Sequence, residues 1–168
     1  LGGLGRLEYR GYDSAGVAVM NGGLKIARSV GRVANVEKLI NDRGGFQGTI
    51  GIAHTRWATH GGVTEKNAHP HRDDEQLGHG IAIIHNGIIE NFSALKTSPT
   101  EKGHVFHGET DTEVLAHLIG ELYAGDLEKA VQELKTSVAI EVEARKTAVT
   151  NLENKLQTYF SEQIKQYN

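Results

Sequence analysis

The alternation of apolar and polar residues predicts short strands in the first half of this chain. Apolar runs at residues 17–20 and 24–30 predict two strands, and Asn21-Gly22-Gly23 between them predicts a hairpin turn. A third strand is predicted at residues 49–57. Its residues 50–53 are almost continuously apolar, which predicts a strand that is covered on both faces. A fourth short strand is predicted at residues 81–84.

Helical spacing of apolar residues predicts helices between and after these strands. One helix is predicted at residues 33–40, and Gly44-Gly45 would end it. A short helix around Leu95 would be interrupted by Pro99, and residues 105–106 could be a strand. Thr110-Asp111-Thr112-Glu113 has the form of a capping box, with Thr110 capping Glu113 at the start of a further helix. The apolar face of that helix would consist of Val114, Leu115, Leu118, Ile119 and Leu122.

The composition changes after Gly125. All 21 glycines and all nine histidines lie at or before that position. Residues 127–134 have helical spacing, and residues 137–142 could be either strand or helix. A terminal amphipathic helix is predicted from the apolar positions Leu152, Leu156, Phe160, Ile164 and Tyr167. The chain is therefore expected to consist of an α/β body followed by a mainly helical tail.

Composition and charge exclude several classes of protein. At 168 residues the chain is long enough for a hydrophobic core of its own. The absence of cysteine excludes a disulfide framework and a thiolate zinc site, and is compatible with a reducing cytoplasm. A net charge of -3 offers no basic face for nucleic acid or anionic lipid, and no apolar run has the length of a membrane span. We therefore expect a cytoplasmic protein that binds neither nucleic acid nor membrane.

Residues 52–61 are the first candidate site, because an apolar strand there ends in a cluster of polar and aromatic side chains. Arg56 stands out, since its planar guanidinium matches a carboxylate with two parallel hydrogen bonds. Together with Asp111 it could bind both ends of an amino acid, with Asp111 taking the ammonium group. The alternative is a structural ion pair for Arg56 and a helix-dipole role for Asp111.

Asn86-Gly87 also has two interpretations. An Asn-Gly pair between apolar runs is the strongest short signal of a type I′ hairpin turn. The same pair could form an oxyanion hole, because an amide side chain and a glycine N–H can both donate to a developing negative charge.

Metal and nucleotide cofactors are not expected. His69-Pro70-His71 is the closest approach to a metal motif, but its spacing matches no zinc signature. The glycine-rich stretches lack both a P-loop lysine and the GxGxxG fingerprint.

Five motifs together resemble the glutaminase domain of glutamine-fructose-6-phosphate aminotransferase, a type 2 glutamine amidotransferase. They lie at residues 6–16, 54–61 (HTRWATHG), 67–71 (NAHPH), 85–91 (HNGIIEN) and 109–113 (ETDTE). The phosphoribosyl-pyrophosphate amidotransferases are similar too, but have glutamine and glutamate where this chain has Tyr12 and Asp13. The aminosugar branch therefore fits better.

The resemblance implies an α+β fold of the N-terminal-nucleophile hydrolase class, a four-layer αββα sandwich. It also implies that Arg56 binds the carboxylate of glutamine and Asp111 its amino group, while Trp57 belongs to a loop that closes over the ligand. The implied substrate-binding residues are Arg56, Trp57, Thr59, His60 and Asp111, and the implied oxyanion hole is Asn86 with Gly87. The implied reaction passes ammonia from glutamine to fructose 6-phosphate, which would bind only to a further isomerase domain.

Two departures from the family pattern change the expectation for this chain. The family nucleophile is a cysteine at the first residue of the mature chain, whereas Leu1 matches a position inside the first helix. The resemblance ends near Leu134, so residues 1–134 are expected to form a domain truncated at both ends, and 135–168 a tail that does not match. The chain should bind glutamine without hydrolysing it, or serve as a non-catalytic binding or interaction module. Its last helix could cover a sheet edge or pair with its copy in a homodimer.

Overall fold

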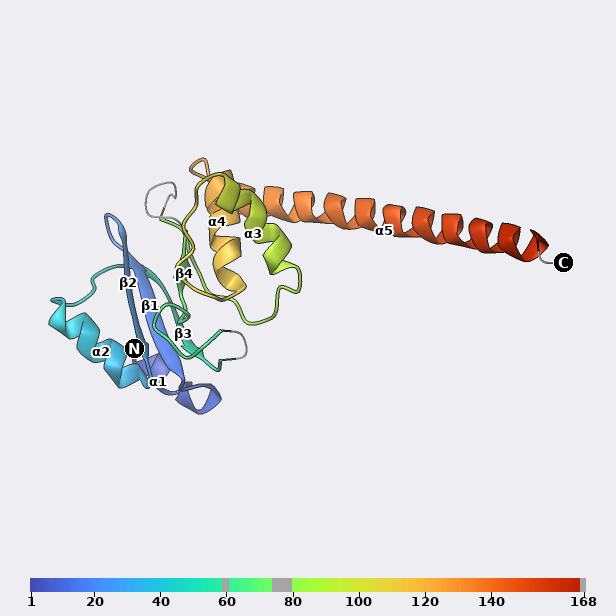
Figure 1. Cartoon of the computed structure of the whole chain (residues 1–168). Coiled ribbons are helices and arrows are strands. Elements are labelled where there is room, and N and C mark those ends of the chain that lie inside the picture. The colour runs from blue at the N-terminus through green and yellow to red at the C-terminus, as the bar shows by residue number, and fades with distance from the viewer. Residues whose placement is uncertain (59–60, 74–79, 167–168) are drawn as a thin grey trace. The chain divides into compact units, whose positions relative to one another are not determined.

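The computed structural model divides the chain into two units, Leu1–Gly125 and Asp126–Asn168 (Figure 1). It describes residues 1–58, 61–73 and 80–166, without the side chains of residue 158 and residues 160–166.

An antiparallel three-stranded sheet organises the first part of unit 1. Strand β1 (Ser14–Met20) lies in the middle, between β2 (Leu24–Val30) and β3 (Ile50–Arg56). The predicted hairpin between β1 and β2 is confirmed, with Met20 opposite Leu24. Ser14 pairs with Arg56, so the end of β3 that carries Arg56 lies at the start of β1.

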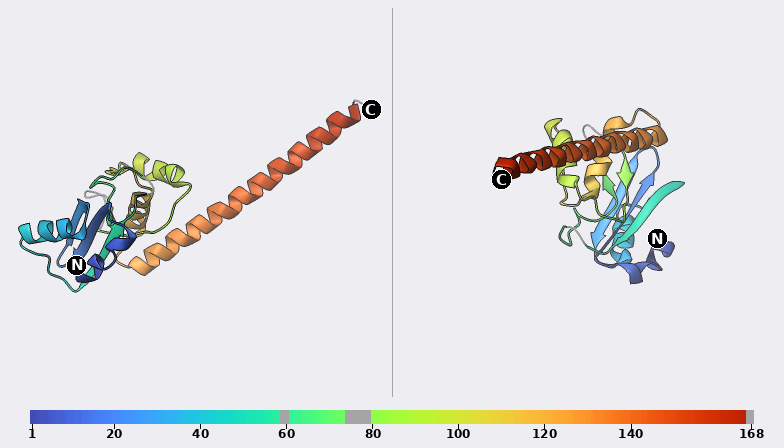
Figure 2. Two further views of the ribbon diagram at one scale, coloured as in Figure 1. Left: turned by 90° about the horizontal axis from the view of Figure 1, so that it is seen from below. Right: turned by 90° about the vertical axis from the view of Figure 1, so that its right-hand side faces the viewer.

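One helix covers this sheet and closes its core. Helix α2 (Val33–Asp42), predicted from its apolar spacing, packs against β1 and β2 (Figure 2). The N-terminus of α2 receives its acceptor from outside the helix, because the Val33 N–H donates to Glu8 Oε1 at 2.6 Å. Glu8 belongs to the 3-10 turn η1 (Glu8–Arg10), which follows the short helix α1 (Gly2–Gly5). The core consists of Leu4, Ala15, Ala27, Val33, Val36 and Ile40.

Strand β3 is not covered on both faces, and this part of the prediction is wrong. Ile50 is 70% exposed, and Gly51 and Ala53 are also exposed. Among the described strands, β3 pairs with β1 alone and is therefore an edge of its sheet. A continuous apolar run favours burial on both faces only where another layer lies against the second face.

The second part of unit 1 contains a two-stranded ladder and two helices. Strands β4 (His71–Arg72) and β5 (Ala82–Ile83) pair antiparallel, and β5 lies within the predicted strand at 81–84. Helix α3 (Phe92–Glu101) packs against α4 (Thr112–Leu122). Pro99 lies inside α3 rather than ending it, with its ring fully buried. Residues 105–106 form no strand.

The predicted capping box at the start of α4 is wrong. Asp111, not Thr110, is the N-cap residue, and no side chain there caps the helix. The Thr110 hydroxyl instead forms a hydrogen bond with His71 Nε2 at 2.9 Å. Glu113 accepts from the backbone N–H groups of His107 and Gly108 at 2.8 and 2.7 Å. The buried His71 and the backbone of residues 107–108 therefore take the place of the local cap and tie α4 to neighbouring segments of unit 1.

In its described residues, unit 2 contains one helix, α5 (Leu127–Gln166), of 40 residues. The strand considered for residues 137–142 is wrong, since these residues continue the helix. In the part of the chain that the structure describes, no helix is long and apolar enough to cross a membrane. The α+β class is confirmed by these elements. With three and two strands in the described sheets, the complete four-layer sandwich stays a prediction.

Candidate functional site

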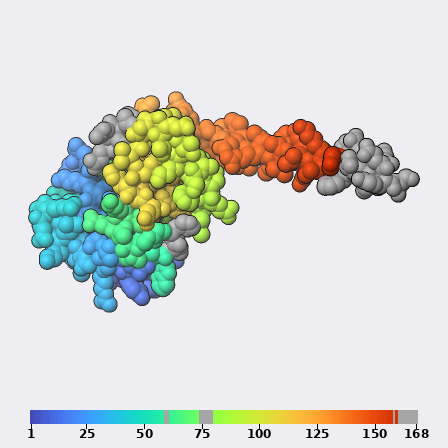
Figure 3. Space-filling view, viewed as in Figure 1, coloured from blue at the N-terminus to red at the C-terminus, as the bar shows by residue number. Residues whose placement is uncertain are grey.

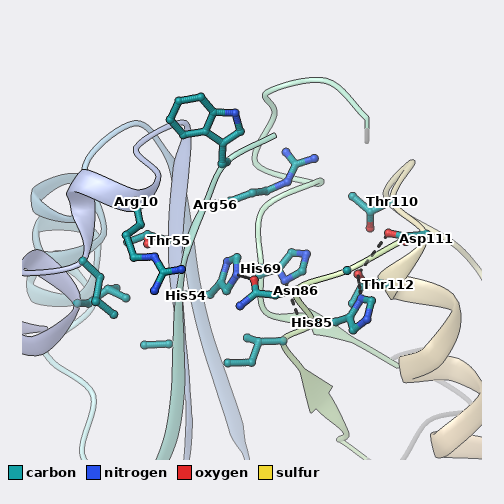
Figure 4. A pocket seen from close by; sticks show the side chains of 16 residues that line it. Arg10, His54, Thr55, Arg56, His69, His85, Asn86, Thr110, Asp111 and Thr112 are labelled. Carbon is teal, nitrogen blue, oxygen red and sulfur yellow. Dashed lines mark hydrogen bonds between the residues drawn. The ribbon is translucent and has the colours of Figure 1, made fainter. Parts of the chain in front are cut away.

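A pocket of about 440 Å³ lies in unit 1, where the end of β3 meets the segments around His69 and Asn86 and the start of α4 (Figure 4). Its volume is in the range of sites that bind small molecules. Of the predicted site residues, the structure brings Arg56, Trp57, Asn86, Gly87 and Asp111 together in its wall. Thr59 and His60 lie outside the described residues.

Arg56 is the last residue of β3 and is only 5% exposed. Its Nη1 donates to the Gly62 carbonyl at 3.2 Å, and its Nη2 to the Gly61 carbonyl at 3.4 Å. Burial lowers the pKa of Arg56, while the carboxylates of Asp13 and Asp111 raise it. A guanidinium remains charged under such a shift, so the pocket wall holds a largely desolvated cation.

Asp111 brings a buried carboxylate to the same pocket and is 4% exposed. Its Oδ2 accepts from the Ile89 N–H at 2.7 Å, and its Oδ1 from the Thr112 hydroxyl at 3.4 Å. Because Asp111 is also the N-cap residue of α4, its charge is favourable next to the helix dipole. The structural role considered for Asp111 is therefore real, and it positions the carboxylate at the pocket.

Asn86 and Gly87 do not form the hairpin that the dipeptide favours. A type I′ turn needs positive φ at both central residues, and neither residue is among the positive-φ positions of the structure. Instead, Asn86 Oδ1 accepts from His54 Nε2 at 2.6 Å across the pocket (Figure 4). Because its oxygen is held by His54, the amide N–H groups of Asn86 are the part of that side chain that can donate to a ligand.

Gly87 lies against the His85 ring. A β-carbon at this position would lie 2.8 Å from His85 Nε2, so a side chain here would displace the imidazole. The His85 ring in turn meets the Thr112 hydroxyl at 3.5 Å. Glycine thus allows backbone and imidazole to approach closely in this wall of the pocket.

Three histidines pack in a row beside the pocket, and two of them, His54 and His69, line it. The His54 ring stacks on His69 at 4.5 Å, and His69 meets His71 edge-on at 4.6 Å. Burial, reinforced by neighbouring histidines and arginines, lowers the pKa of His69 to about 3 and that of His71 to about 2. These imidazoles are uncharged at neutral pH. Among the described residues, no group of three or more histidines and carboxylates is arranged to hold a metal ion.

Asn67 forms hydrogen bonds that connect motifs separate in the sequence. Its Oδ1 accepts from the Glu109 N–H at 2.8 Å, and its Nδ2 donates to Gly62 O at 3.0 Å and Glu109 Oε2 at 3.1 Å. Gly62 also accepts from Arg56, so this amide links the position of Arg56 to the segment that leads into α4.

The sequence did not single out every residue of the pocket wall. Arg10, His54, His69 and Thr112 also line it. Arg10 and His54 lie inside the quoted motifs at 6–16 and 54–61, which was the available signal. His69 and Thr112 likewise lie inside the motifs at 67–71 and 109–113, and their other interpretations were a metal ligand and part of a capping box.

Acid should destabilise unit 1 through the buried histidines. Below pH 6.5 the unfolded chain takes up protons on His69 and His71 that the folded chain, with pKa values of about 3 and 2, does not bind. The free energy of unfolding should therefore fall by roughly 2–3 kcal/mol for each histidine between pH 7 and pH 4.5. Calorimetric unfolding at a series of pH values measures this slope. A His69→Asn chain with an unchanged slope would contradict the assignment.

Comparisons with known proteins agree with the resemblance. A family model described as "Glutamine amidotransferase domain" matches residues 27–153. The glutamine-fructose-6-phosphate aminotransferase [isomerizing] of Chlorobaculum tepidum is 52% identical over 139 residues, which are 79% of this chain and 22% of that protein. The protein of the same name from Pyrobaculum aerophilum is 45% identical over 171 residues, 96% of this chain and 26% of that protein. The chain thus spans about a quarter or less of these relatives.

Solved structures show the same fold relationship. Glutamine phosphoribosylpyrophosphate amidotransferase from B. subtilis, complexed with ADP and GMP, matches with a TM-score of 0.61 and 28% identity over 80% of this chain and 29% of that chain. A structure titled as the allosteric regulatory enzyme of purine biosynthesis matches with a TM-score of 0.65 and 30% identity over the same shares. With the family model covering most of its residues, this chain belongs to the glutamine amidotransferase domain family.

Proposed function

We propose that this chain binds glutamine in the pocket of unit 1 and represents the glutamine-binding part of a glutamine-fructose-6-phosphate aminotransferase. The observation that carries the proposal is the pair of buried, oppositely charged side chains, Arg56 and Asp111, in the wall of one pocket. An α-amino acid carries the complementary pair of charges, a carboxylate and an ammonium group.

Arg56 would take the α-carboxylate of glutamine. Its contacts with the Gly61 and Gly62 carbonyls are long, at 3.4 and 3.2 Å, whereas charge-assisted contacts to a carboxylate are shorter and stronger. Asp111 would take the α-ammonium group with Oδ1, because the contact of Oδ1 with the Thr112 hydroxyl, at 3.4 Å, is longer than that of Oδ2 with the Ile89 N–H, at 2.7 Å. Thr59 and His60 are proposed to complete this end of the site.

Asn86 and Gly87 would hold the other end of the ligand. The His54 hydrogen bond fixes the Asn86 amide, so its N–H groups can donate to the carboxamide oxygen of glutamine. In an enzyme with a nucleophile, the same donors would stabilise the oxyanion. Trp57 would cover the ligand. It is 61% exposed and packs edge-on against Tyr12 with ring centroids 6.1 Å apart.

The complete reaction that we propose for the parent enzyme hydrolyses glutamine to glutamate and passes the ammonia to fructose 6-phosphate, giving glucosamine 6-phosphate. The 168 residues contain no cysteine to attack the carboxamide. The chain as given should therefore bind glutamine without hydrolysing it, as would a non-catalytic module derived from this domain.

Titration calorimetry tests the binding proposal. L-glutamine should bind one site in unit 1, and L-asparagine, shorter by one methylene, should bind more weakly because it cannot reach Asn86 while Arg56 and Asp111 hold its α-groups. No ammonia should be released. Absence of glutamine binding would refute the proposed site, whereas ammonia release would refute only the claim that the chain is inactive.

A further inference from the structure

Helix α5 carries a row of exposed apolar side chains. Val131, Val138, Val142, Val149, Leu152, Leu156 and Tyr159 are all more than a third exposed. Figure 2 shows α5 as one uninterrupted helix, and Figure 3 shows its surface. The row contains four β-branched valines, which are weaker helix formers than alanine or leucine. A long helix of this composition is stabilised mainly by packing of its apolar side against a partner.

The spacing of this row is a heptad repeat. Val142, Val149 and Leu156 occupy successive a positions, and Val138, Leu152 and Tyr159 occupy d positions. The pattern begins at Val131, also a d position, and runs through about four heptads, enough for a coiled coil. It is broken by two cations, Lys135 at a and Arg145 at d.

The surface of α5 already has the shape that such a partner needs. A shallow, largely apolar hollow is lined by Val142, Arg145, Lys146 and Val149, with Thr150 at its margin. The first four residues are spaced i, i+3, i+4 and i+7. This is the four-residue hole that receives a side chain in knobs-into-holes packing.

We propose that residues 131–159 of α5 form an antiparallel two-stranded coiled coil with a second copy of this chain. In the register that we assign, Val142 faces Leu152 of the second copy, and Val138 faces Leu156. The hollow around Arg145 receives Val149 of the second copy.

Lys135 and Arg145 favour antiparallel over parallel pairing of the two helices. A parallel pair in register would place Arg145 against Arg145 and Lys135 against Lys135, and burying like charges opposite each other is costly. The antiparallel register places Arg145 opposite Val149 and Lys135 opposite Tyr159, whose ring can accept a cation. Arg145 also keeps its ion pair with Glu141 on its own helix.

The charged residues that flank the a and d positions agree with this register. Glu141 and Lys155 are both g positions, and in an antiparallel pair the g positions of the two helices face each other. Glu141 of one copy thus lies near Lys155 of the other, twice in the dimer. Lys146, at an e position, would face Lys146 of the second copy. On its own helix, however, Lys146 Nζ is paired with Glu143 Oε1 at 2.7 Å.

Sedimentation of the full chain tests whether residues 131–159 form the proposed dimer interface. The unaltered chain should form a concentration-dependent dimer. Changing both Val142 and Val149 to Asp should weaken dimerisation by at least 100-fold. The matched control changes Ile140 and Thr147, both f positions on the opposite side, to Asp and should leave dimerisation within a few-fold. A monomeric or trimeric parent chain, or equal loss in the control, would overturn the proposal.

Disulfide trapping tests the direction without disturbing folding. Because the chain contains no cysteine, single substitutions give unambiguous cross-links. Val142→Cys and Leu152→Cys chains should each remain uncross-linked alone and form a covalent dimer when mixed under oxidation. Cross-linking of Val142→Cys with itself would show a parallel pair and overturn the proposal, as would no cross-link in the mixture.

Discussion

Glutamine binding should weaken by about 100-fold when Arg56 is replaced by alanine. The change removes the only buried guanidinium that lines the described pocket wall and leaves the ligand carboxylate without its charge-assisted partner. Such hydrogen bonds contribute about 1.5–3 kcal/mol each, and 1.4 kcal/mol is a factor of ten in affinity. Titration calorimetry with L-glutamine measures the loss.

Arg32→Ala is the matched control, because Arg32 is exposed at the N-cap of α2 and does not line the pocket. It removes the same charge from unit 1 and should leave affinity within a factor of two. An Arg56→Ala chain that remains folded and binds glutamine as well as the parent would rule out Arg56 as the carboxylate ligand.

Replacing Gly16 with alanine should destabilise unit 1 by about 3 kcal/mol or more. A β-carbon at this position would lie 2.1 Å from the His69 carbonyl oxygen and 3.0 Å from that of Ala27. Both contacts are with backbone, so β1 or the segment around His69 must move, and overpacking of this kind is destabilising. Calorimetry should show a decrease of about 10 °C in the melting temperature of unit 1.

Gly23→Ala is the control for this substitution. Gly23 lies in the turn after β1, has no atom within 4 Å of an added β-carbon and does not have a positive φ. The melting temperature of unit 1 in the Gly23→Ala chain should remain within about 2 °C of that of the parent. If Gly16→Ala were equally mild, the close packing of β1 against the His69 segment would not exist in solution.

The parts of the fold that could be predicted are those fixed by local sequence. Strand β2 has the predicted bounds, 24–30, because Asn21-Gly22-Gly23 fixes the preceding turn. Helix α2 begins at Val33 as predicted, and its apolar spacing determines which face meets the sheet. These elements depend on neighbours within a few residues, and such neighbours are visible in the sequence.

The parts that could not be predicted depend on partners and surroundings that the spacing of the residues does not reveal. Thr110 and Glu113 have the spacing of a capping box, but His71, His107 and Gly108 compete for their side chains. Pro99 is tolerated inside α3 with its ring buried. The alternation at residues 137–142 favoured a strand as much as a helix, and the long helix on both sides of them decides the outcome.

The candidate site was predictable as a set of residues but not as an arrangement. Arg56 and Asp111 were paired by their chemistry, and the structure brings both to one pocket. The hydrogen bond between His54 and Asn86 could not be foreseen, because it joins segments that are distant in the sequence. Their proposed roles in glutamine binding stay a prediction that the substitutions above test.

The position of Trp57 makes it an intrinsic fluorescence probe of the pocket. It is the only tryptophan in the sequence, it lines the pocket, and its indole is mostly exposed beside Tyr12. All indole emission of the protein therefore arises at the edge of one cavity. The emission wavelength and the quenching of this fluorescence therefore report on the solvent around the pocket. Neither α5 nor the hydrophobic core contributes tryptophan emission.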